Sequence, residues 1–419
     1  MEHNGHGDER EPAEARGSRV RRPAAVAAVA ALAVGAAGVW LVPKLADSGA
    51  DADGRLRAGA GAARESGAAA APGRPFTLVA TGDIIPYPSI IARAADDAGA
   101  GGQSHDFRKI LAGVKPLVSA ADLALCHHEI PYGQPGGPYT GYPTFKAPHQ
   151  LAASLKDTGY EGCSTASNHT LDAGYEGLVR TLDHLDKAGL KHVGSARSPK
   201  EAATPAWYTA GGAKVAQLSY TYGTNGIPLP DGKPWSVNLI DRQRILDDAR
   251  AARRAGAQVV LVSVHWGTEW QTAPDEQQRT LAKELTAART GGMPDIDLII
   301  GTHNHVPQPY EKVNGVWVVY GMGDQVASFV PADKKRGNMS SVPRFTFAPW
   351  PGHPGRWQVV KAEYFTQYSD MGPPFRVACV SCGPAPEGRR EEYAAVDRQV
   401  TEAVLSRGAA AQGLVRATR

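Results

Sequence analysis

The chain has 419 residues, of which 42% are hydrophobic and 21% are charged. This composition is typical of a globular protein, and the length is sufficient for a sizeable core. The formal net charge is only +3, and no stripe of Lys and Arg with interleaved aromatic residues is present, so we expect no nucleic-acid partner.

The N-terminal part of the chain is expected to lie outside the folded core. Residues 23–42 (PAAVAAVAALAVGAAGVWLV) carry no charge, and as a helix they would span about 30 Å, the thickness of the hydrocarbon core of a bilayer. Arg21 and Arg22 precede this run and Trp40 lies near its end, so we expect a single-pass transmembrane anchor with residues 1–22 in the cytoplasm. A cleaved signal peptide or a twin-arginine export signal remains an alternative.

Residues 43–75 are rich in Ala, Gly, Asp and Arg and offer no bulky apolar face. They are therefore expected to form a flexible linker. All three interpretations of the N-terminus export the rest of the chain, so the predicted location is the cell membrane, with the folded domain on the extracytoplasmic side.

From Phe76 onward, short apolar runs alternate with helical patterns. Near-continuous apolar strands joined by helices are typical of a layered α/β domain with buried sheets. The expected strands are residues 76–83, 122–129, 160–169, 213–221, 257–267, 295–305 and 316–324, and the expected helices are residues 175–189, 240–256 and 275–292.

Beyond about residue 370 the pattern fades into Pro, Gly and charged residues, followed by a short helical segment at 391–408. We therefore assign the α/β domain to residues 76–370. Residues 371–419 are expected to form a C-terminal tail that is peripheral to any chemistry.

The four cysteines fit an exported protein. Cys379 and Cys382 form a C-x-x-C motif that we expect to be a small disulfide loop, because no second pair accompanies it to make a metal site. Cys126 and Cys163 each lie near the end of an expected strand. They could be buried thiols or a bridge, and the sequence does not decide between these.

Ligand-type side chains follow five of the expected strands, the positions where functional groups gather in α/β sheets. Carboxylates, an amide and imidazoles form a mixed oxygen and nitrogen set that suits Mn²⁺, Fe²⁺ or Zn²⁺. More than four candidates favour two metals that share a carboxylate and a water and act on a phosphoryl or related ester. The candidates are Asp83, His127, His128, Glu129, Asn168, His169, His265, Glu269, His303 and His305.

The order of these motifs resembles the bacterial capsule-synthesis protein CapA family of poly-γ-glutamate biosynthesis. The motifs are Gly-Asp, a short motif ending in Glu, Asn-His, His-Trp-Gly-x-Glu, and Gly-x-His-x-His followed by a strand and Tyr-Gly-x-Gly. The resemblance covers roughly Phe76 to Phe329. That family is similar to the calcineurin-like metallophosphoesterases, which implies a layered sandwich of mixed sheets flanked by helices.

The resemblance also implies roles for individual residues. His169 matches the histidine that does not bind metal but acts as a general acid, a role worth typically 10²–10⁴-fold in rate. The implied metal ligands are Asp83, Glu129, Asn168, His265, His303 and His305.

Two features depart from the expected patterns, the first from that of the family and the second from that of many metallophosphoesterases. Asn-Leu-Glu is usual where this chain has His127, His128 and Glu129, and either imidazole could be an added ligand, a donor to a ligand or plain surface. Ile85 stands where many metallophosphoesterases have a histidine two positions after the first aspartate, so one of the two metal sites could have fewer ligands.

For three further residues the local sequence suggests roles other than metal binding. Asp172 and Gly174 are expected to serve the turn after Asn168. Glu269 could orient His265 as a carboxylate partner, or it could be an ordinary solvated side chain.

These observations predict a membrane-anchored, metal-dependent hydrolase or transferase. Its expected substrate is a cell-surface polymer such as poly-γ-glutamate or a phosphoester, and the N-terminal helix provides its contact with the membrane. Two alternatives remain: an extracytoplasmic phosphodiesterase or nucleotidase, and a non-catalytic component of capsule assembly.

Overall fold

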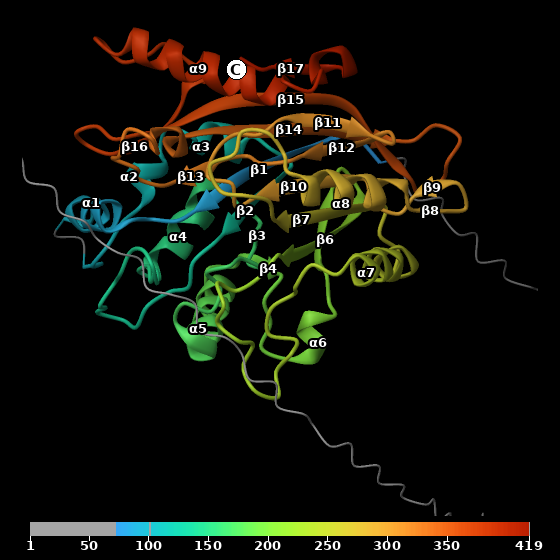
Figure 1. The fold of residues 1–419 in the computed structure, drawn as a ribbon, viewed down its shortest axis with the longest axis horizontal. Coiled ribbons are helices and arrows are strands. Elements are labelled where there is room, and N and C mark those ends of the chain that lie inside the picture. Colours follow the sequence, from blue (N-terminus) through green and yellow to red (C-terminus); the bar gives the residue numbers. More distant parts are fainter. Residues whose placement is uncertain (1–72, 100–101, 419) are drawn as a thin grey trace, which may run out of the picture. The chain divides into compact units, whose positions relative to one another are not determined.

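The computed structural model describes residues 73–99 and 102–418 (Figure 1). The predicted cytoplasmic segment, the transmembrane anchor at residues 23–42 and most of the linker lie outside the described residues. Within the two described ranges, no helix is both long enough and apolar enough to traverse a bilayer.

The larger sheet is mixed and has nine strands. Strands β1 to β4 run parallel to one another, whereas β14 pairs antiparallel with β1. In spatial order the strands are β16 (Arg376–Cys379), β15 (Trp357–Asp370), β14 (Met339–Pro349), β1 (Phe76–Ile84), β2 (Leu123–His128), β3 (Gly162–Ser164) and β4 (Lys191–Val193), with β13 (Asp324–Val326) beside β1 and β17 (Leu414–Arg416) beside β15.

The second sheet has six strands, and its central pairs β6–β7, β7–β10 and β10–β12 are parallel. A separate two-stranded sheet consists of β8 (Arg289–Thr290) and β9 (Met293–Pro294). In spatial order the six strands are β11 (Tyr310–Val313), β12 (Val316–Val319), β10 (Leu298–Thr302), β7 (Val259–His265), β6 (Ala213–Thr221) and β5 (Ala206–Ala210).

The two sheets share one apolar cluster, in which Leu78 and Leu125 of the first sheet lie with Val215, Leu261 and Leu298 of the second. Alternate residues of the same strands point away from this cluster, since successive side chains of a strand face opposite sides. The predicted α/β class is therefore confirmed, and the two sheets form the inner layers of the domain.

Helices cover the outer faces of the sheets. Ala124 and Cys126 of β2 share a cluster with α1 (Pro88–Ala98), α2 (Arg108–Leu111), α3 (Lys115–Ser119), α4 (Gln150–Thr158) and α5 (Gly174–Lys187). Val260 and Val262 of β7 share another with α7 (Arg242–Arg254) and α8 (Glu276–Ala287), and the short α6 (Pro199–Ala202) precedes β5.

The segment after residue 370 is built into the larger sheet. Strands β16 and β17 both pair with β15, and α9 (Arg390–Leu405) inserts Val396, Val400 and Val404 into the apolar cluster between the sheets (Figure 1, red). The strands have only four and three residues, too few for a recognisable alternation, so the sequence pattern indicated a peripheral tail there.

The structure contains two disulfides. Cys379 bonds to Cys382, as predicted, and Cys126 bonds to Cys163, which decides between the two interpretations that the sequence allowed. Cys126 and Cys163 are register partners on the adjacent parallel strands β2 and β3. Their bridge lies one residue before His127 and two residues before His128.

Removing the Cys126–Cys163 bridge with a double alanine substitution is expected to lower the free energy of unfolding by about 2–4 kcal/mol, because it releases a loop closed over 37 residues. Urea unfolding under non-reducing conditions measures the loss. The matched control is the double alanine substitution of Cys379 and Cys382, whose loop spans three residues and whose loss should be smaller. Equal losses would contradict the loop-length argument.

Candidate metal centre

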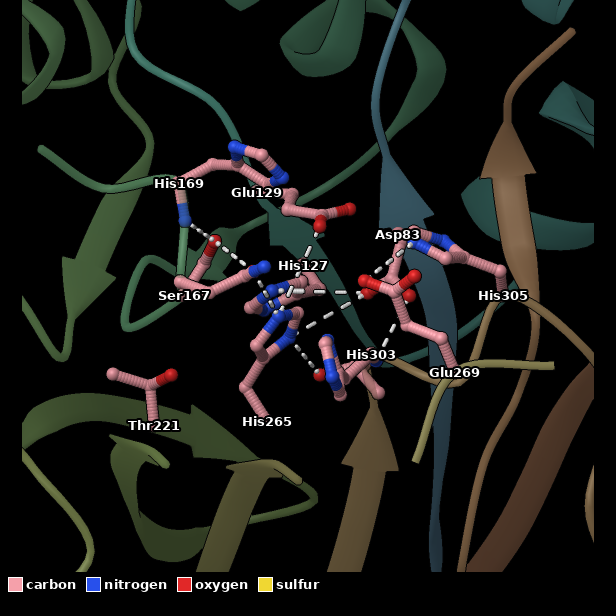
Figure 2. A network of polar contacts seen from close by, with 12 residues as sticks. Asp83, His127, Glu129, Ser167, His169, Thr221, His265, Glu269, His303 and His305 are labelled. Carbon is pink, nitrogen blue, oxygen red and sulfur yellow. Dashed lines mark hydrogen bonds and ion pairs between the residues drawn. The ribbon is translucent and has the colours of Figure 1, made fainter. Parts of the chain in front are cut away.

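The predicted site residues gather where the parallel strands of both sheets end (Figure 2). Asp83 of β1 is the register partner of His127 of β2, and His265 of β7 is the register partner of Thr302 of β10. All six predicted metal ligands are at least 95% buried: Asp83, Glu129, Asn168, His265, His303 and His305.

His265 connects ligands from both sheets. Its Nε2 lies 2.8 Å from Asn168 Oδ1 and 3.8 Å from Glu129 Oε1, while its Nδ1 lies 2.9 Å from Thr302 Oγ1 and 3.9 Å from Asp83 Oδ1. The loop after β3 and the end of β7 therefore meet at one imidazole. Residues 97 positions apart in the chain, Asn168 and His265, are in hydrogen-bond contact.

The turn after β10 places His303 and His305 in the same group. Both have left-handed backbone angles, with φ of 94° and 59°, a conformation that is uncommon for residues other than glycine and often found at functional sites. The backbone N–H of His303 donates to Asp83 Oδ2 at 2.9 Å, and the His303 ring centroid lies 4.8 Å from that of His265.

Among the residues that the structure describes, two groups of three side chains have ligand atoms within 4.8 Å of one another. One consists of Asp83, Glu129 and His305, all of them predicted ligands. The other consists of Asp83, His127 and His265, which adds an imidazole whose role the sequence left open. His303 belongs to neither group of three, although its ring packs against His265.

The polar atoms of this centre fit a divalent cation. Asp83 Oδ1, both Glu129 carboxylate oxygens, His127 Nε2 and His303 Nδ1 are buried and have no hydrogen-bond partner among the described residues. Buried carboxylates without a partner are costly, and a cation would compensate them. The oxygen and nitrogen donors match Mn²⁺, Fe²⁺ or Zn²⁺.

Burial and neighbouring charges shift the pKa values of the residues in this centre. Burial raises the pKa of Asp83 and Glu129, and the charge of a neighbouring carboxylate (Asp324 for Asp83, and Asp83 for Glu129) raises each further. Burial holds the pKa of His265 and His303 well below the usual range, so both imidazoles are neutral and able to bind a metal.

Asp324 is a site residue that the sequence analysis missed. It is fully buried at the start of β13, and its two carboxylate oxygens lie 3.0 and 3.2 Å from His305 Nδ1. Burial alone lowers the pKa of His305, but the charge and hydrogen bond of Asp324 outweigh it and raise that pKa to about 10. Asp324 is the last residue of the strand expected at 316–324. A search for ligand-type side chains at strand ends, which selected Asp83, could therefore have found it.

His169 is held by Asp172, which lies in the predicted turn, where its backbone N–H donates to the His169 carbonyl, and has this further role. The Nδ1–H of His169 donates to Asp172 Oδ2 at 2.7 Å, and the same oxygen accepts the backbone N–H of Phe145 at 2.7 Å. The carboxylate thereby fixes the tautomer of the imidazole and leaves Nε2 available. The sequence could not distinguish a partner of His169 from a turn residue, because aspartate is common three positions into a turn as well.

One interpretation of the sequence made Glu269 a carboxylate partner that orients His265, and the structure places it elsewhere. Its Oε1 lies 4.0 Å from His305 Nε2, and its side chain is 44% exposed. Glu269 therefore lies at the open side of the centre. The pair is too long for a hydrogen bond.

Fold and site together define an α/β protein of two packed sheets with a buried oxygen- and nitrogen-rich centre at the strand ends. The chain belongs to the bacterial capsule synthesis protein family PGA_cap, whose family model matches residues 77–328. The family resemblance predicted from the motif order is thus confirmed.

Curated relatives include two capsule proteins. The PGA biosynthesis protein CapA of Bacillus subtilis is 30% identical over 41% of this chain and 44% of its own length, and the capsule biosynthesis protein CapA of Bacillus anthracis is 26% identical over 43% of each. The chain therefore spans less than half the length of these relatives. Among solved structures, the calcineurin-like phosphoesterase YfkN of Bacillus subtilis aligns with 79% of this chain and 98% of its own, at 15% identity and a TM-score of 0.41.

Proposed function

We propose that this protein is a divalent-metal-dependent hydrolase or transferase that acts on a cell-surface polymer such as poly-γ-glutamate. The observation that carries the proposal is the convergence of the predicted ligands into one buried centre, in which Asp83 Oδ1 and both Glu129 carboxylate oxygens have no hydrogen-bond partner among the described residues. The capsule and PGA biosynthesis names of the family and of its relatives support the choice of substrate.

Each element of the centre has a role in this proposal. Asp83, Glu129 and His305 would hold one cation, and Asn168, His265 and His303 would complete the place for a second. A divalent cation bound there polarises the oxygen of a phosphoester or acyl group and lowers the pKa of water.

His169 supplies the proton for the leaving group. In this role His169 acts as an imidazolium: Asp172 holds its Nδ1–H, and the proton on Nε2 is the one that passes to the leaving group. The hydrogen bond to Asp172 orients the ring, so His169 does not need to bind the metal in order to act as a general acid.

We also propose that the protein is anchored in the membrane by residues 23–42, with the α/β domain on the extracytoplasmic side. The uncharged run of 20 residues in the sequence supports the anchor. Two disulfides in the folded part are consistent with an oxidising compartment.

The test uses the full-length protein, purified in detergent, with its metal content measured by mass spectrometry. Incubation with a chelator is expected to abolish shortening of poly-γ-glutamate chains, and added Mn²⁺ or Zn²⁺ should restore it. Fast hydrolysis of a chromogenic phosphodiester without any effect on the polymer would replace the proposal with a phosphodiesterase. A protein that binds no metal and turns over neither substrate would be an assembly component.

A further inference from the structure

His127 is a buried imidazole at the end of β2 that none of the roles above uses. Its exposed fraction is 2%, and its Nε2 lies 3.7 Å from Asp83 Oδ1. Its ring stacks on that of His265, with centroids 4.7 Å apart and planes at 23°. The side chain therefore points into the centre (Figure 2).

Its hydrogen bonds determine which nitrogen carries the lone pair. Ser164 Oγ donates to the Cys126 carbonyl at 3.4 Å, so it accepts from His127 Nδ1–H at 2.8 Å. The neutral imidazole has a hydrogen on only one of its two nitrogens, and Nε2 is therefore an acceptor. It has no hydrogen-bond partner among the described side and main chains.

Asp83 Oδ1 is also an acceptor without a partner. Its companion Oδ2 is occupied by the backbone N–H of His303. Two buried lone pairs, on His127 Nε2 and Asp83 Oδ1, thus face each other across 3.7 Å. This arrangement is unfavourable with nothing between them and favourable with a cation that both bind.

We propose that His127 is itself a metal ligand, and that with Asp83 and His265 it forms a nitrogen-rich cation site. The inference rests on the proposed metal centre and adds a ligand from the strand next to β1. Ile85, two positions after Asp83, is apolar and buried, so β1 supplies no imidazole of its own. His127 supplies one through the β1–β2 register.

The proposed site has a metal preference of its own. Two imidazoles and one carboxylate favour Zn²⁺, Fe²⁺ or Co²⁺ over Mg²⁺ and Ca²⁺, which prefer oxygen ligands. The group of Asp83, Glu129 and His305 has two carboxylates and one imidazole. The two places should therefore differ in affinity for zinc.

The experiment compares His127→Ala with His128→Ala in the full-length protein. His128 is the matched control because it is the neighbouring residue of β2, is equally buried and points to the other face of the sheet, where its ring lies 4.6 Å from that of Tyr132. His127→Ala is expected to bind less zinc per chain and to weaken zinc affinity by at least about tenfold. His128→Ala should match the wild type.

Metal content by mass spectrometry and zinc affinity by calorimetry give the result without any activity assay. If His127→Ala keeps the zinc content and affinity of the wild type while His303→Ala loses metal, this inference fails and the proposed function stands. If the wild type binds no metal, both fail.

A second measurement covers the case in which His127→Ala does not fold. Zinc-loaded crystals of the wild type should show an anomalous peak at about 2.0–2.1 Å from His127 Nε2, the usual zinc–imidazole distance. Zinc peaks that all lie beyond bonding distance of this nitrogen would overturn the assignment.

Discussion

His303→Ala is expected to remove metal from the centre and to reduce hydrolysis to the background rate. The imidazole packs against His265, and its Nδ1 is buried without a partner, so its loss removes a ligand and not a hydrogen bond. Removing partners of ligands costs about 10–100-fold in metal affinity, and loss of a ligand itself should cost at least that much.

The substitution is specific to the side chain. The His303 backbone N–H, which donates to Asp83 Oδ2, is retained in the variant. Metal content and turnover are measured together on the same preparation. His353→Ala, at an exposed histidine far along the chain, is the control and should retain both. A His303→Ala protein with full metal and full turnover would show that this histidine is not a ligand.

His169→Ala is expected to lower turnover by about 10²–10⁴-fold while metal content stays unchanged. The imidazole is held by Asp172 through Nδ1, and it belongs to neither of the two groups of candidate metal ligands. Because its proposed role is to protonate the leaving group, the defect should shrink for a phosphodiester with a good leaving group such as nitrophenolate.

Asp172→Asn is expected to have an intermediate effect on turnover, because asparagine keeps the shape of the side chain but forms a weaker, uncharged hydrogen bond with the His169 imidazole. Its turnover should fall between that of the wild type and that of His169→Ala. In cells, a His169→Ala protein that fully restores capsule to a deletion strain would point instead to the non-catalytic role in assembly.

Local patterns predicted the elements that carry the site. The strand expected at residues 213–221 is β6, the one expected at 76–83 lies within β1, and the one expected at 295–305 contains β10. The helix expected at 175–189 is α5, which spans Gly174–Lys187. These elements have long apolar runs or strong helical periodicity, so the signal is contained within each segment.

Other elements have no such signal. Strand β14 has eleven residues and β15 has fourteen, and they pair antiparallel at eleven positions, yet their apolar residues do not alternate regularly with polar ones. The short strands β16 and β17 acquire their structure from pairing with β15. For these segments the partner, and not the local sequence, determines the conformation.

The sequence by itself determined which residue types stand at the strand ends and the family to which their order belongs. Only the tertiary structure decided that Asp83 and His303, 220 positions apart, share a hydrogen bond, that Asp324 holds His305, and that His127 and not His128 turns toward the centre. Strand alternation is a local property of the chain, whereas the packing of one sheet on another depends on contacts between residues distant in sequence. The centre forms where those two sheets meet.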